Sequence, residues 1–211
     1  METARARRGR PPRPEQVARN RRLLLDAALD VFRELGYSRA SLDAIADRAG
    51  FSKGAVYSHF QGKADLFLSL LEDQIAERAT SQRALVRALE GSTDVRRGFV
   101  EIYERSRQDP AWRLALLEFR VVAARDPELN ARYADAHRTT LAGIVEALDQ
   151  LHRRLGVRPR RPLDELAVAS IALDAGGFLE DVADPGALPG KRLAVLFMDM
   201  AGLADPREES P

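Results

Sequence analysis

The chain has 211 residues, of which 45% are hydrophobic and 31% charged, and this ordinary globular composition excludes disorder throughout. It contains no cysteine, and its three histidines, His59, His137 and His152, lack the spacing of metal ligands. We therefore expect no metal site, no cofactor and no redox role. Apolar runs such as 193–198 are far shorter than the roughly 18 residues that a membrane span needs. The start of the chain lacks the apolar core of a signal peptide, so we expect a cytoplasmic protein.

The net charge of +1 is unevenly distributed, because residues 1–63 carry thirteen Lys and Arg against seven Asp and Glu. Residues 1–14 are rich in Arg, Gly and Pro without apolar periodicity, which predicts a disordered basic arm. The run from Arg8 to Pro11, which includes Arg10, looks like the core of an AT-hook, whose arginines lie along a narrow minor groove. A generic solvated basic tail is the alternative. Either way, the basic charge is concentrated as a DNA-binding surface requires.

The first helix is predicted over residues 15–35, with apolar residues at helical spacing inside and Gly36 at its end. The segment 41–67 then carries the most informative pattern in the chain. Ser41 can cap a short helix with an apolar face, and Gly50 supplies the sharp turn that ends it.

A second short helix follows almost at once. Ser52 can cap it, and Val56 and Phe60 lie four residues apart on its buried side. Two short helices joined by a glycine turn form a helix-turn-helix, which places its second helix in the DNA major groove. The residues on the other surface of this helix are the candidates for contact with DNA: Lys53, Gly54, Ala55, Tyr57, Ser58 and His59.

Three residues near this motif are unfavourable for a helix. Lys53 and Lys63 both fall in a first helical turn, where the helix dipole disfavours a cation by roughly 0.3–1 kcal/mol. Gly54 lies inside a helix, where glycine costs about 1 kcal/mol relative to alanine. A bound phosphate would compensate the lysines, and close approach to base edges would explain the glycine. Solvated charges and a tolerated glycine are the alternative interpretation of each residue taken singly.

The run ALDVFRELGYSRASLDAIADRAGFSKGAVYSHFQGKADLF resembles the tetracycline-repressor (TetR) family of bacterial transcription regulators. The resemblance covers roughly residues 21–70, and the rest of the chain shares only length and helical character. It implies an all-α fold with a three-helix DNA-binding domain over 15–62 and a six-helix ligand-binding and dimerisation domain over 63–205. Residues 206–211 are expected to form a flexible tail.

Every periodic segment after residue 62 is predicted to be helical, and none alternates as a strand would. Asp109-Pro110 and Asp126-Pro127 each combine a cap with a first-turn proline, so each predicts a helix start. With the DNA-binding domain, the expected total is nine helices. The six in the second domain are predicted over 63–80, 95–106, about 110–125, 127–155, 164–183 and 189–203.

Polar groups within apolar stripes of the second domain are candidates for orienting a ligand. Asp174 lies among apolar residues, where an acid is costly without a partner. It would favour a cationic ligand, but Arg120 could simply neutralise it. Each such residue is also compatible with an ordinary core or surface role, and the ligand's chemistry stays undetermined. The predicted ligand-binding residues are Tyr103, Trp112, Leu116, Phe119, Arg120, Tyr133, His137, Asp174 and Phe178.

A regulator that reads two half-sites requires a two-fold protein, and the last two helices carry apolar stripes suited to self-association. The resemblance likewise implies a four-helix dimer interface built from these helices. Packing onto their own domain is the alternative. The predicted interface residues are Ala175, Leu193, Leu196, Phe197 and Met200.

Together these features predict a dimeric repressor that binds a palindromic operator and is released by a small-molecule effector. Ser41, Tyr57, His59 and Lys63 would hold phosphates, while Lys53, Gly54 and Ala55 would approach base edges. An activator shares every one of these features, and a non-specific architectural DNA binder is a further alternative. An enzyme is disfavoured, because the sequence shows no set of nucleophile, base and orienting group and no phosphate-binding loop.

Overall fold

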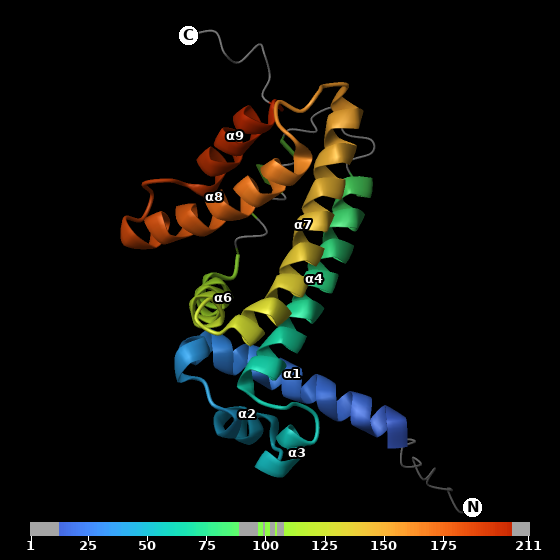
Figure 1. The fold of residues 1–211 in the computed structure, drawn as a ribbon, viewed down its shortest axis with the longest axis vertical. Helices are drawn as coiled ribbons and strands as arrows, with labels where there is room; N and C mark the ends of the chain where they lie inside the picture. The colour runs from blue at the N-terminus through green and yellow to red at the C-terminus, as the bar shows by residue number, and fades with distance from the viewer. Residues whose placement is uncertain (1–12, 89–96, 99, 102–103, 105–107, 204–211) are drawn as a thin grey trace, which may run out of the picture.

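The computed structural model describes residues 13–88, 97, 98, 100, 101, 104 and 108–203. The described part contains eight bounded helices and no strand, which confirms the all-α prediction (Figure 1). The expected basic arm with Arg8 and Arg10, most of the stripe over 95–106 and the tail lie outside these residues. The helices are α1 (Arg13–Arg39), α2 (Leu42–Ala49), α3 (Lys53–Tyr57), α4 (Lys63–Ala88), α6 (Pro110–Ala123), α7 (Pro127–Leu155), α8 (Leu163–Ala183) and α9 (Gly190–Ala201).

The capping residues that the sequence predicts form the expected hydrogen bonds. The Ser41 hydroxyl accepts from the Ala44 amide at 3.1 Å, and the Ser52 hydroxyl accepts from the Ala55 amide at 3.3 Å. Gly50 adopts the left-handed conformation with φ 70°, which lets its amide return to the last carbonyls of α2. Carboxylate caps likewise begin α6 and α7 before their prolines.

Three helix ends differ from the sequence prediction. Helix α1 is kinked at Gly36 (φ 73°, ψ 170°), where the first helix was expected to stop, but helical turns resume up to Arg39. Helix α4 runs to Ala88 rather than to residue 80, because no glycine or proline interrupts it before Gly91. Helix α9 ends at Ala201 instead of residue 203, since Gly202 takes up a left-handed conformation.

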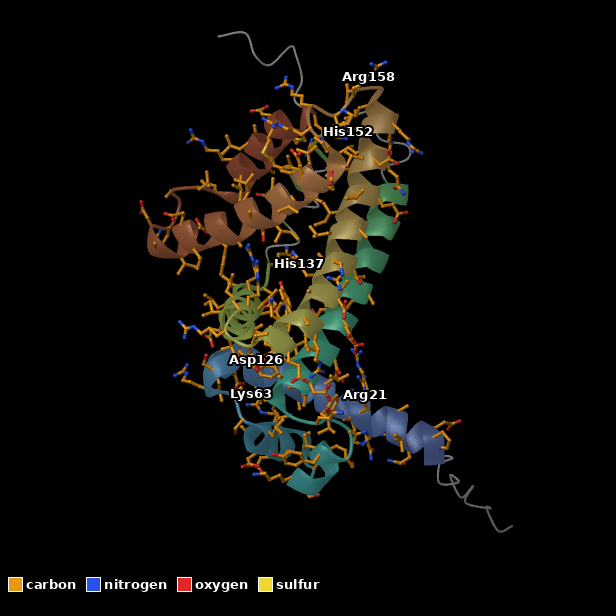
Figure 2. The ribbon with its side chains drawn as sticks, viewed as in Figure 1. Arg21, Lys63, Asp126, His137, His152 and Arg158 are labelled. Atoms are coloured by element: carbon orange, nitrogen blue, oxygen red, sulfur yellow. The ribbon has the colours of Figure 1, made fainter. Side chains whose placement is uncertain are left out.

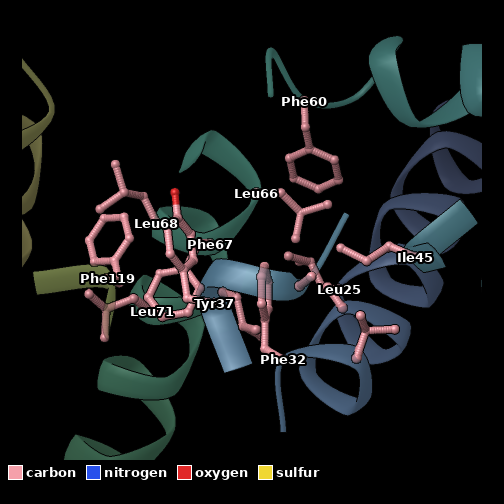
Figure 3. Packing of buried hydrophobic residues seen from close by; sticks show 14 of the residues in the cluster. Leu25, Phe32, Tyr37, Ile45, Phe60, Leu66, Phe67, Leu68, Leu71 and Phe119 are labelled. Atoms are coloured by element: carbon pink, nitrogen blue, oxygen red, sulfur yellow. The ribbon is translucent and has the colours of Figure 1, made fainter. Parts of the chain in front are cut away.

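Two separate groups of buried residues hold the fold together. The first, which we call the lower core, contains residues of α1, α2, α3, α4 and α6 and of the start of α7. Its centre is a set of aromatic rings from four elements, among them Phe67 and Phe119 (Figure 3). Phe67 of α4 stacks on Phe119 and on Trp112 of α6. The second, the upper core, joins the far end of α7 to α8 and α9. Helices α4 and α7 lie side by side and run from the lower end of the molecule toward the upper end (Figure 1).

No helix in the described part of the chain is both long enough and apolar enough to cross a bilayer. The same residues contain no cluster of three or more His, Cys, Asp or Glu arranged to hold a metal ion.

Candidate nucleic-acid interface

Helix α3 is mounted on α2 and the lower core by one buried face. Val56 is fully buried and Phe60 nearly so, and both belong to the same core as Ile45 of α2. The opposite face of α3 is open: Tyr57 is 52% exposed, Lys53 and Gly54 are exposed, and Ala55 is half-buried. The structure therefore brings the predicted DNA-facing residues together on one short helix and the turn that follows it.

The serines of the motif have structural hydroxyl contacts. Besides the two caps described above, the Ser58 hydroxyl donates to the carbonyl of Ala55 at 2.7 Å. His59 lies half-buried beside the ring of Phe60, with their centroids 6.3 Å apart. Phosphate contacts by Ser41 and His59, and the predicted contacts of Ser52 and Ser58 with DNA, stay predictions.

Lys53 has an ion-pair partner within the motif. Its ammonium nitrogen lies 2.8 Å from a carboxylate oxygen of Asp43 on α2, and both side chains are more than half exposed. The hydrogen bond from Lys53 to Asp43, followed by the attraction between the two charges, raises the pKa of Lys53. The unfavourable position of this lysine in a first turn is thus offset by Asp43 in the free protein, without a phosphate.

Lys63 is held even more firmly. Its ammonium donates to the carbonyl oxygens of Tyr37, Ser38 and Ala40 at 2.8, 3.2 and 3.0 Å, and lies 4.6 Å from the Tyr37 ring centroid (Figure 2). Partial burial lowers the pKa of Lys63. Because these contacts satisfy the ammonium, the position of Lys63 no longer requires a phosphate to explain it. A phosphate contact stays a prediction.

Gly54 leaves open space in front of α3. A Cβ added at this position would lie 4.0 Å from the Ser52 hydroxyl and meet nothing closer. Packing within the protein therefore does not require glycine here, which is the expected situation if the constraint comes from an approaching base pair.

Arg21 is a neighbour of the motif that was not among the predicted site residues. Its guanidinium lies 5.3 Å from the centroid of the Phe60 ring, immediately after α3 (Figure 2). The sequence shows only that Arg21 belongs to a basic segment, since the contact depends on how α1 crosses the motif.

The predicted ligand-binding residues divide into two groups. Trp112 and Phe119 lie in the lower core, 1% and 0% exposed, where both rings stack on Phe67. Their role in lining a ligand pocket stays a prediction. Leu116 is half-buried against the same core, and Tyr103 lies outside the described residues. Phe119 also borders Tyr133, which stacks on His137 with centroids 5.6 Å apart. Burial, and then the positive charge of Arg120, lower the pKa of His137.

Arg120, which the sequence offered to neutralise Asp174, is not its ion-pair partner in the structure. Arg113, not Arg120, pairs with Asp174, with a guanidinium nitrogen 2.6 Å from the carboxylate and 2.9 Å from the Asp174 carbonyl oxygen. Arg113 is only 8% exposed and lies 4.2 Å from the centroid of the Phe178 ring. Arg113 and Arg120 are seven residues apart on one face of α6, so periodicity alone could not distinguish them.

A shallow depression of about 240 Å³ between α4 and α7 has no predicted ligand-binding residue in its lining. It is lined by Asp65, Leu68, Ser69, Glu72, Arg132 and Asp135.

The predicted dimer residues also divide. Leu193 and Phe197 are buried within their own chain, whereas Leu196 is 46% exposed and Ala175 and Met200 are half-buried. We call the exposed apolar side chains of α8 and α9 the open face. It consists of Val168, Leu179, Val182, Val195 and Leu196.

A short exposed helix mounted on a capped partner helix, in an all-helical chain, defines a helix-turn-helix regulator of transcription. Residues 24–70 match the family described as bacterial regulatory proteins, tetR family. Over these residues the chain is similar to members of that family.

Relatives with stated roles extend the match. The transcriptional activator FasR of Mycolicibacterium smegmatis is 39% identical over 98 residues, covering 46% of this chain and 43% of that protein. This match therefore spans less than half of FasR. The transcriptional repressor AcnR of Corynebacterium diphtheriae is 29% identical over 173 residues, covering 81% and 85%. The regulator FadR of Bacillus subtilis, solved with stearoyl-CoA, has the same fold, with a TM-score of 0.58, 13% identity and coverage of 87% and 99%.

Proposed function

We propose that the protein is a dimeric repressor that binds a palindromic operator through α3 and releases it when a small molecule occupies the second domain. The observation that carries this proposal is the pairing of an exposed α3 at the lower end with an open apolar face on α8 and α9. A second copy covering the open face would give the two-fold symmetry that an operator with two half-sites demands.

The exposed face of α3 supplies the specific contacts. Lys53, Gly54 and Ala55 would approach base edges, and Tyr57, His59, Ser41 and Lys63 would contact phosphates. Arg8 and Arg10 would add minor-groove contacts beside the operator. Lys53 is suited to recognise a base in this arrangement, because its ammonium can leave the exposed Asp43 carboxylate and donate hydrogen bonds to guanine instead.

A small-molecule effector is supported by the second domain and by FadR, which was solved with stearoyl-CoA bound. Tyr133, His137 and Arg120 would take part in recognition, and their mixture of aromatic, titratable and cationic groups suits an amphipathic ligand. For release, the effector must bind more tightly to the conformation that does not fit DNA, by a coupling of typically 1–3 kcal/mol.

Binding to the DNA upstream of the protein's own gene tests the DNA-binding part of this proposal. In a mobility-shift assay with competitor DNA, the unmodified protein should shift this fragment and not a scrambled one. Tyr57→Ala should weaken the shift at least tenfold, because the substitution removes an exposed side chain from α3. Asp135→Ala, on the exposed surface of α7, is the matched control. Equal affinity for both fragments would instead identify a non-specific architectural protein.

An activator is a second candidate, favoured by the 39% identity with the activator FasR over 98 residues. Transcription in vitro from the shifted promoter separates the two. Adding the protein lowers transcript yield for a repressor and raises it for an activator.

A further inference from the structure

The α1–α2 turn, by which we mean residues 36–40 from the kink in α1 to the residue after its end, is held from two directions by charged side chains. From α6, the Glu118 carboxylate accepts a hydrogen bond from the Ser38 amide at 2.7 Å. From α4, Lys63 donates to three carbonyls of the same turn, as described above. Glu118 and Lys63 also attract one another, since the charge of Glu118 acts to raise the pKa of Lys63 against the larger effect of burial.

Gly36 makes the approach of Glu118 possible. A Cβ on Gly36 would lie 2.4 Å from a carboxylate oxygen of Glu118, so a larger residue would have to displace the carboxylate. Gly36 also has φ +73°, which L side chains rarely adopt. The carboxylate therefore lies directly on the backbone of the turn, and Ser41, the cap of α2, follows three residues after Ser38.

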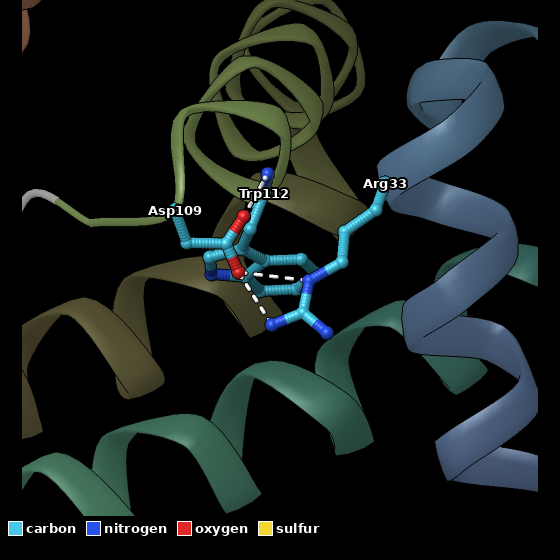
Figure 4. A network of polar contacts seen from close by, with 3 residues as sticks. All are labelled: Arg33, Asp109 and Trp112. Atoms are coloured by element: carbon cyan, nitrogen blue, oxygen red, sulfur yellow. Dashed lines mark hydrogen bonds and ion pairs between the residues drawn. The ribbon is translucent and has the colours of Figure 1, made fainter.

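Helix α6 is joined to both parts of the molecule. Near its start, Arg33 of α1 donates two hydrogen bonds to Asp109, which also caps α6 by accepting from the Trp112 amide (Figure 4). One turn along, Arg113 is bound to Asp174 of α8. Helix α6 therefore contacts α1 through Asp109 and α8 through Arg113, and the carboxylate of Glu118 adds a contact with the α1–α2 turn.

We propose that Glu118 is a positioning residue through which a displacement of α6 is passed directly to the α1–α2 turn and hence to the helix-turn-helix. This inference rests on the proposed function and adds a route that does not pass along the connecting helix α4. A charge-assisted hydrogen bond depends steeply on distance and angle, so moving α6 must either break the bond or shift the Ser38 backbone with it. Because Ser38 precedes the α2 cap, the shift reorients α2 and the α3 mounted on it.

The test uses operator DNA as the probe, since coupling between two sites is reciprocal. Hydrogen–deuterium exchange is measured on the full chain with and without the upstream DNA fragment. In the unmodified protein, saturating DNA should slow exchange at least twofold in peptides covering 110–123, although α6 is in the second domain. In Glu118→Ala, measured at saturating DNA, this response of α6 should disappear.

Operator affinity supplies the second measurement. Glu118→Ala should raise the Kd for the operator about tenfold, in keeping with loss of a hydrogen bond to a charged group. Glu118→Gln retains an oxygen that can accept from Ser38, so it should stay within about threefold of the unmodified protein and restore the α6 response. Asp135→Ala removes a carboxylate from an exposed pair on α7 and should change neither value.

The outcomes separate this inference from the proposed function. Failure of the unmodified protein to bind the fragment specifically overturns the proposed function. Specific binding with an α6 response that persists in Glu118→Ala overturns the role of Glu118 alone. The Tm of each variant shows whether the substitution has caused a general loss of structure. If Glu118→Ala has a lowered Tm, the test rests on Glu118→Gln instead. The inference fails if Glu118→Gln is folded and yet loses the α6 response.

Discussion

The lower and upper cores differ in how completely a single chain buries them. The lower core is built around large aromatic rings from α1, α4 and α6, and it encloses residues such as Phe32 and Phe67 fully. The upper core contains few buried residues, among them Phe197, and the helices that form it leave Leu179 and Leu196 exposed. A wide apolar surface on a folded domain is unusual unless a partner covers it.

Exposed apolar side chains are not confined to the upper core, since α6 at the lower core exposes Leu114, Val121 and Val122. What differs is the number of residues that each core buries. The DNA-binding domain and α6 share one core, so a single copy suffices to position α3. Helices α8 and α9 present apolar residues both inward, as at Leu193, and outward, as at Leu196. The predictions below test this contrast between a self-sufficient lower core and an upper core that a second copy would complete.

The largest effect is expected in the lower core. Phe67→Ala removes a ring that lies within 5.1 Å, between centroids, of four other rings: those of Phe32, Tyr37, Trp112 and Phe119. The free energy of unfolding should fall by about 3–5 kcal/mol, measured by urea denaturation. A loss below about 1 kcal/mol would mean that the aromatic rings do not form a tightly packed centre.

A matched pair on α9 compares a buried position with an exposed one beside the upper core. Leu193 is 1% exposed and contacts the position of Gly177, whereas Leu196, one turn away, is 46% exposed. Leu193→Ala should lower the free energy of unfolding by about 2–5 kcal/mol, while Leu196→Ala should change monomer stability by no more than about 0.5 kcal/mol.

Sedimentation completes this comparison. Leu196→Ala should weaken self-association measurably if the open face is the dimer interface. A monomer mass for the unmodified protein at all concentrations would contradict the assignment of the open face to a second copy.

A smaller effect is expected at Gly54. Because a Cβ there meets open space, Gly54→Ala should stabilise the free protein by up to about 1 kcal/mol through helix propensity. The same methyl group should reduce specific operator binding by entering the space where a base edge approaches. Improved stability with unchanged operator affinity and sequence preference would show that α3 does not approach DNA at this residue.

The smallest effect concerns pH and His137. Its lowered pKa means that the unfolded chain binds a proton more readily than the native protein, whose imidazole is half-buried near Arg120. As pH falls below 6.5, protonation of His137 therefore favours the unfolded chain and the free energy of unfolding declines. Above that pH, His137 is neutral in both states and this loss of stability is absent. Tm should drop less between pH 8 and pH 5.5 in His137→Gln than in the unmodified protein. Identical pH profiles would contradict the contribution of His137.

Local chemistry explains what the sequence could predict. The caps Ser41 and Ser52 and the turn at Gly50 act within a few residues, so their roles follow from spacing alone. The buried positions of Val56 and Phe60 follow from helical periodicity in the same way. All five were predicted correctly.

The failures concern contacts between distant segments. The choice of Arg113 over Arg120 as the partner of Asp174 depends on where α8 crosses α6. Leu193 is buried and Leu196 exposed because of the way in which α9 approaches Gly177 of α8. The three carbonyls around Lys63 belong to a turn 23 to 26 residues earlier, a contact that no local pattern in the sequence specifies.

The contacts of Lys63 have a consequence for how ionic strength will affect the protein. Binding to DNA weakens with salt according to the number of cations that protein side chains displace from the duplex. To contact a phosphate, the Lys63 ammonium must give up hydrogen bonds to three carbonyls, just as Lys53 and Arg48 must leave Asp43 and Glu34. Counting basic residues in the DNA-binding domain will therefore overestimate the number of counterions released.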